Sequence, residues 1–129
     1  MDNREAYIPW AIKVAFAFLA AWWLQVPDAV RLMLVLIAAD VITGVWAAII
    51  SKDLSSDVSF VGLSKKLLVV FVVSLTAYLE PYTVQGLTTI VAGFYAAHEG
   101  LSIIENLGKA GVPVPPILID ILRKPGRKE

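Results

Sequence analysis

Long apolar stretches separated by short polar breaks dominate the pattern of this chain. Four such stretches can be drawn, over residues 7–26, 31–50, 60–79 and 81–97. The first two are each about 20 residues long, which as helix spans roughly 30 Å, the thickness of a bilayer core. The third reaches that length only if Lys65 and Lys66 extend their ammonium groups to the interface. The pattern predicts an all-α integral membrane protein with four transmembrane helices.

The third and fourth stretches are separated by Glu80-Pro81. Proline cannot continue a helix that precedes it, so the third helix is expected to end here, and Glu80 is expected to be a solvated loop carboxylate. The fourth stretch is rich in Gly and Thr and ends at His98-Glu99. The alternative is that these two stretches form a re-entrant hairpin that does not cross the membrane.

The distribution of basic residues predicts the orientation. With a cytoplasmic N-terminus and four crossings, only Arg31 lies on the outer side, and ten basic residues lie inside: Arg4, Lys13, Lys52, Lys65, Lys66, Lys109, Arg123, Lys124, Arg127 and Lys128. An excess of Lys and Arg in cytoplasmic loops is the usual bias of membrane proteins. Both termini are therefore expected on the cytoplasmic side of the membrane.

A separate amphipathic helix is predicted over residues 99–110. Its polar arc contains Glu99, Ser102, Glu105 and Asn106, and its apolar arc is formed by Leu and Ile. Glycines and prolines end it, and a short apolar segment with a basic tail follows over residues 116–129. We expect this helix to lie on the cytoplasmic surface of the membrane, with the basic tail against anionic lipid.

A carboxylate, Asp40, lies in the middle of the second apolar stretch. Insertion of an aspartate at that depth costs about 2.5–3.5 kcal/mol, so it is expected to face protein or water. On a helix, one face would carry Asp40, Thr43, Gly44, Ala47 and Ala48. Small residues let a second helix approach closely, which predicts a helix–helix or oligomer contact. The Asp40 carboxyl group has its polar partner either inside its own chain, for example Thr43 or Lys13, or in a contact between copies or at a pore.

Other residues fit the membrane interface better than they fit chemistry. Trp22, Trp23, Lys13, Lys65 and Lys66 are predicted to be membrane anchors. The chain is 58% hydrophobic, has no cysteine and has one histidine, His98, which excludes thiolate and histidine-rich metal sites. No nucleotide-binding or nucleophile motif occurs. The sequence predicts no enzyme, no metal, no cofactor and no nucleic-acid partner.

Three blocks of sequence resemble the toxin-secretion/phage-lysis holins, a family of small bacteriophage membrane proteins. The first, Asp40 to Ala48, is similar to the family's Asp-x-x-Thr-Gly-x-x-x-Ala. The second is Leu54-Ser55-Ser56 followed by Gly62 to Leu67, and the third is the run from Glu99 to Pro115. The blocks cover about residues 33–122, and the first apolar stretch matches only in hydropathy.

The resemblance implies a function without catalysis. Holins oligomerise in the bacterial cytoplasmic membrane and open lesions that release or activate an endolysin, which needs no direct contact with the holin; some relatives export toxins. A separate protein would have to serve as any antiholin, because the next methionine after the first is Met33. Two alternatives remain open: a small four-span proton-coupled transporter that uses Asp40, and an antiholin.

Overall fold

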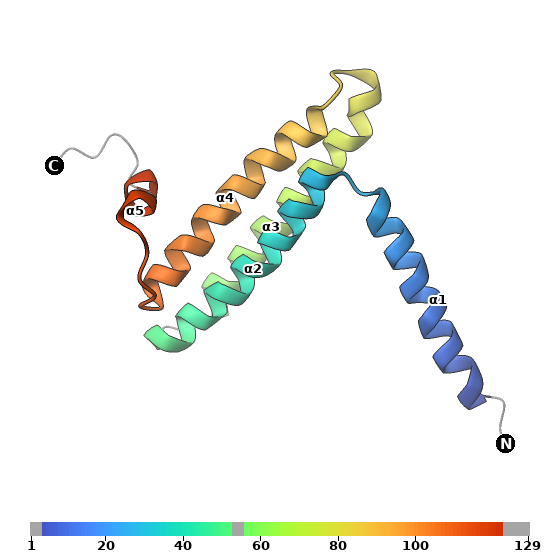
Figure 1. The fold of residues 1–129 in the computed structure, drawn as a ribbon, viewed down its shortest axis with the longest axis horizontal. Helices are drawn as coiled ribbons and strands as arrows, with labels where there is room; N and C mark the ends of the chain where they lie inside the picture. Colours follow the sequence, from blue (N-terminus) through green and yellow to red (C-terminus); the bar gives the residue numbers. More distant parts are fainter. Residues whose placement is uncertain (1–3, 53–55, 123–129) are drawn as a thin grey trace.

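The computed structural model describes the backbone of residues 4–52 and 56–122, and this part of the chain is entirely helical outside its turns. The helices are α1 (Arg4–Gln25), α2 (Asp28–Ser51), α3 (Ser56–Leu79), α4 (Leu87–Lys109) and α5 (Pro116–Leu122), with the 3-10 helix η1 (Glu80–Tyr82) after α3. Helices α2, α3 and α4 lie side by side, whereas α1 leaves one end of this bundle at an angle (Figure 1). The predicted basic tail, residues 123–129, and linker residues 53–55 lie outside the described residues.

Three helices in the described part of the chain are long and apolar enough to cross a membrane. They cover Asp28–Ser51, Phe60–Tyr82 and Leu87–Lys109. The second and third of these are 23 residues each, about 35 Å as helix, which favours two full crossings over a re-entrant hairpin. A fourth crossing by α1 stays a prediction.

The last long helix differs from the prediction at both of its ends. The expected span 81–97 begins only at Leu87, because η1 and Gly86, with φ 85°, turn the chain first. The expected break at His98-Glu99 is wrong: α4 continues without interruption through the segment predicted to be a separate surface helix. The reason is that Glu99 does not end the apolar face but points into the bundle, where it is 3% exposed.

The bundle is held by residues spaced seven apart. The buried positions of α2 are Met33, Asp40 and Ala47, and α3 contributes Lys66 and Val73 at the same spacing. This is the repeat by which helices keep one seam facing a partner. Met33 and Val73 form the apolar core with Ala92 and Ala96 of α4.

The outside of the bundle carries many large apolar side chains. Large side chains on the outer faces include Ile42 and Trp46 of α2, Phe71 of α3 and Phe94 of α4, each more than 60% exposed. In water, contiguous apolar surface on this scale would promote association or aggregation. In a bilayer it is the surface that contacts lipid, and polar side chains belong inside.

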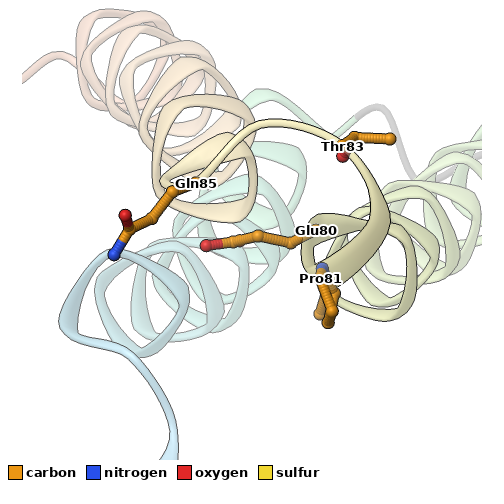
Figure 2. Close-up of a pocket in the computed structure, with 5 residues that line it drawn as sticks. Glu80, Pro81, Thr83 and Gln85 are labelled. Carbon is orange, nitrogen blue, oxygen red and sulfur yellow. The ribbon is translucent and has the colours of Figure 1, made fainter.

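The connection between α3 and α4 is fastened by Glu80, which is not a free loop carboxylate. Its Oε1 accepts a hydrogen bond from the amide of Gly86 at 2.8 Å, and its Oε2 accepts one from the amide of Thr88 at 3.0 Å. These amides belong to the first turn of α4, where backbone donors have no partner within the helix. Figure 2 shows Glu80 reaching across the turn, beside a shallow depression lined by Ala77, Glu80, Pro81, Thr83 and Gln85.

Candidate functional site

A cluster of charged side chains lies in the centre of the bundle, one from each helix. Lys66 Nζ of α3 is 2.5 Å from Asp40 Oδ2 of α2 and also pairs with Glu99 Oε2 of α4. The side chains of Lys66, Asp40 and Glu99 are 16%, 8% and 4% exposed. One ammonium group therefore ties together two carboxylates from the other two helices, and we name these three residues the charge cluster.

An amide extends the charge cluster along the contact between α2 and α4. Asn106 Nδ2 donates to Asp40 Oδ1 at 2.8 Å and lies 3.3 Å from both Asp40 O and Thr43 Oγ1. The Thr43 hydroxyl in turn donates to the carbonyl of Asp40 at 3.1 Å. Both oxygens of the Asp40 carboxylate are thus engaged, one by Lys66 and one by Asn106.

The small face predicted on α2 lies against α4 of the same chain. A Cβ added to Gly44 would be 3.4 Å from Asn106 Nδ2, and Ala47 is 4% exposed. Thr43 and Ala48 are half-buried. The opposite face, with Ile42, Val45, Trp46 and Ile49, is exposed as expected for lipid contact. A role of the small face in contacts between copies stays a prediction.

The assignment of Lys66 as a membrane anchor is wrong. Lys66 turns inward because two buried carboxylates compensate its charge, which lipid cannot do. The neighbouring Lys65 is exposed, as an anchor requires. Their different surroundings follow from helix geometry, since consecutive residues are about 100° apart around the axis.

The predicted polar arc of the C-terminal segment is divided by the bundle. Glu99 is buried and Asn106 is half-buried against Asp40, whereas Glu105 is exposed and forms an ion pair with Lys109 at 2.8 Å. Ser102 is half-buried. A helix on the membrane surface would leave all four polar residues exposed, so the surface location is corrected for this segment.

The remaining predicted anchors lie on α1. Lys13 and Trp22 are exposed and Trp23 is half-buried. The two tryptophans are at the end of α1 that joins the bundle (Figure 1). Their anchoring role stays a prediction, and neither Lys13 nor any other residue of α1 contributes to the charge cluster among the contacts that the structure describes.

The chemistry of the charge cluster is electrostatic. Paired buried charges hold helices in register, and separating them in a low-dielectric medium is costly. Among the described residues, no group of three or more His, Cys, Asp and Glu side chains is placed to hold a metal ion. The site is therefore suited to holding three transmembrane helices together, and to a marked loss of stability when one charge is removed.

Comparison with known proteins gives a consistent result. A family model described as "Bacteriophage holin family" matches residues 17–125. The chain is 40% identical over 93 residues to a "Probable holin" of Bacillus phage phi105, covering 70% of this chain and 69% of the phage protein. It is 34% identical over its whole length to an "Uncharacterized 14.9 kDa protein in nagH 3'region" of Clostridium perfringens, also covered completely.

A third relative is "Uncharacterized protein YqxH" of Bacillus subtilis, which is 41% identical over 96 residues, 71% of this chain and 67% of that protein. No solved structure matches the chain.

Proposed function

Since the chain belongs to the bacteriophage holin family, we propose that it oligomerises in the bacterial cytoplasmic membrane and forms lesions there. These lesions would release or activate an endolysin for host lysis, or in a related setting export a toxin. Family membership carries the proposal, and the apolar exterior of the bundle supports it, because that surface suits a protein that accumulates in lipid.

We propose four membrane crossings with both termini in the cytoplasm. Helix α1 supplies the additional crossing: it is 22 residues long, about 33 Å, and its apolar side chains from residue 9 to residue 25 are exposed apart from Trp23. In this orientation the α3–α4 turn at Glu80 lies outside and the α2–α3 connection after Ser51 lies inside. The basic residues near the helix ends and in the tail support this arrangement, because seven lie on the inner side and only Arg31 on the outer: Arg4, Lys52, Lys109, Arg123, Lys124, Arg127 and Lys128.

The alternative transporter has less support from the geometry. A proton-coupled carboxylate has to exchange with water on each side of the membrane, but both oxygens of Asp40 are engaged by Lys66 and Asn106. The depression in Figure 2 lies at the turn between α3 and α4 and is not lined by Asp40. The arrangement fits a structural role for Asp40 better than proton transport.

Induction of the gene in a bacterium tests the proposal. Membrane potential is followed with a fluorescent dye and viability by plating, with and without a co-expressed murein hydrolase that has no export signal. We expect an abrupt loss of potential at a threshold amount of protein, and lysis only when the hydrolase is present. Cells that stay polarised and alive at high expression would contradict the proposal. If this protein instead delayed the lysis that a co-expressed holin causes, it would be identified as an antiholin.

A further inference from the structure

Helix α1 is largely exposed over the part whose side chains the structure describes. From Pro9 to Gln25, every side chain is exposed except that of Trp23, which is half-buried. Only Val26 and Pro27 separate α1 from α2, and Pro27 is extended, with ψ 144°. Figure 1 shows α1 directed away from the other three helices. Its one charged residue between Pro9 and Gln25 is Lys13.

The charge cluster contains one carboxylate more than it has ammonium groups. Lys66 serves both Asp40 and Glu99, and Asn106, which is neutral, engages the second oxygen of Asp40. Glu99 is only 3% exposed and pairs with Lys66 through Oε2. The charge cluster therefore has one more negative than positive formal charge, and a further cation would balance it.

Lys13 lies at the same depth as the charge cluster. Counted from the ends at which α1 meets α2 and α3 meets α4, Lys13 is 12 residues deep in α1, Asp40 12 in α2, Glu99 12 in α4 and Lys66 13 in α3. At about 1.5 Å per residue, all four would lie about 18–20 Å from that side if the helices crossed the membrane in parallel. The face of α1 that carries Lys13 also carries Ala17 and Ala20, four and seven residues on, which leave room for a second helix.

The geometry points to Lys13 of one copy as the missing cation for Glu99 of a second copy, with α1 packed along the α3 side of that copy's bundle. Charge complementarity and equal depth favour this partner, and the angle at Val26–Pro27 directs α1 away from its own bundle. The α3 side is chosen because Lys66 is the most exposed member of the charge cluster. This inference rests on the proposed oligomerisation and names the contact that would produce it.

Lys65 is the competing cation. It is 14 residues deep in α3 and exposed, so depth alone does not separate it from Lys13. Lys65 belongs to the bundle itself. Because it is next to Lys66, its side chain leaves the helix about 100° around the axis from that of Lys66, which faces Glu99. It therefore serves as the matched control, since removing it takes away an exposed lysine at nearly the same level.

Cysteine cross-linking tests the contact, because the chain has no cysteine of its own. Ala17 is four residues beyond Lys13 and half-buried Val70 is four beyond Lys66, so parallel packing of α1 on α3 brings them to one level. Two differently tagged chains, one with Ala17→Cys and one with Val70→Cys, are co-expressed and oxidised in membranes. We expect a cross-link between the tags. Ala15→Cys, on the opposite face of α1, is the control and should cross-link far less.

The charge is tested in the same cross-linking pair. We expect Lys13→Met to lower the cross-linked fraction roughly fivefold to thirtyfold, the range that corresponds to interhelical polar contacts in membranes, while Lys65→Met leaves it unchanged. If Lys13 acts through Glu99, then Glu99→Gln should also lower the cross-linked fraction. The double variant should then show a cross-linked fraction no lower than that of Lys13→Met alone.

Each contrary outcome has a definite meaning. Equal cross-linking of Ala15→Cys and Ala17→Cys would show random collision and overturn the contact. A cross-link found only within chains that carry both cysteines would place α1 on its own bundle. If Lys65→Met lowered the cross-linked fraction and Lys13→Met did not, the cation would be assigned to Lys65. Collapse of the membrane potential without any of these cross-links would refute the inference while leaving the proposed function intact.

Discussion

Asn106 donates its side-chain amide to Oδ1 of Asp40 at 2.8 Å, which joins α4 to α2 across 66 positions of the sequence. The same nitrogen lies 3.3 Å from the hydroxyl of Thr43. One amide therefore fixes the register of α2 against α4, at the point where Gly44 lets the two helices approach. This contact and the charge cluster beside it lead to the following predictions.

Removal of the amide should loosen α4 from α2. Asn106→Leu deprives Asp40 Oδ1 of its donor, and a buried acceptor left without a partner costs about 1–3 kcal/mol. Asn106→Asp should be worse, because it places a second carboxylate against Asp40. Unfolding of the purified protein in mixed detergent, followed by tryptophan fluorescence, measures both. Glu105→Ala, one residue away and exposed, is the control, and equal losses in all three variants would refute the assignment.

Lys66 should be the most sensitive residue of the bundle. Lys66→Met leaves Asp40 and Glu99 facing each other without a cation, which should lower the free energy of unfolding by about 3–5 kcal/mol. Lys65→Met should change it by less than about 0.5 kcal/mol, since Lys65 is exposed. The same detergent unfolding measurement compares the two variants.

Neutralising the whole charge cluster should restore stability that Lys66→Met removes. In the triple variant Asp40→Asn, Lys66→Met, Glu99→Gln, no uncompensated charge is left in the interior, and replacement of complete buried ion pairs is often close to neutral. If the triple variant were as unstable as Lys66→Met alone, the loss would come from packing and not from charge.

Replacement of Asp40 by Leu should act on assembly more than on folding. Lys66 and Glu99 remain as one cation and one anion, so the interior keeps a balanced pair, while Asn106 loses its acceptor. We expect altered oligomer size in detergent or altered timing of the loss of membrane potential after induction. A variant identical to the native protein in both would show that Asp40 does not control assembly.

Two glycines that both lie within helices should differ in how well they tolerate a large side chain. A Cβ at Gly44 would lie 3.4 Å from Asn106, whereas a Cβ at Gly62 would meet no atom within 4 Å. Gly44→Leu should therefore separate α2 from α4 and abolish the folded bundle, while Gly62→Leu should be tolerated. The yield of monodisperse protein in size-exclusion chromatography distinguishes them, and equal tolerance at both positions would contradict the close approach.

The orientation can be measured with single cysteines. Thr83 lies in the exposed turn after η1, and Lys52 caps the end of α2 in a left-handed conformation, with φ 56°. With the termini in the cytoplasm, Thr83→Cys should react with a membrane-impermeant maleimide in spheroplasts. Lys52→Cys should react only after the membrane is permeabilised. The reverse labelling would invert the proposed topology.

The sequence predicted the helices better than it predicted their partners. Apolar length alone identified α2 and α3 to within a few residues, and helical periodicity identified the face of Asp40, because both are local properties. It did not predict the inward turn of Lys66, since burial of a lysine depends on carboxylates of other helices. The usable signal was the seven-residue spacing of Lys66, Val73 and Glu80, which places all three on one face.

The error at α4 has a similar cause. The hydropathy pattern predicts the end of a span at His98-Glu99, but a carboxylate is unfavourable within a span only where its side chain faces lipid. Thr88, Ala92, Ala96 and Glu99 form one buried stripe, and Asn106 continues it seven residues later. Small and polar residues on one face, with Ile and Leu elsewhere, indicate a helix that packs inward.

The charges buried in the bundle limit how its helices can separate within a bilayer. If the three helices separated in hydrocarbon alone, Asp40, Lys66 and Glu99 would lose their ion pairs and no water would solvate their charges. Separation of the helices is expected to need water that enters the bundle and solvates these charges. We therefore expect a dry, partly separated bundle to be disfavoured, because its buried charges would lack both one another and water.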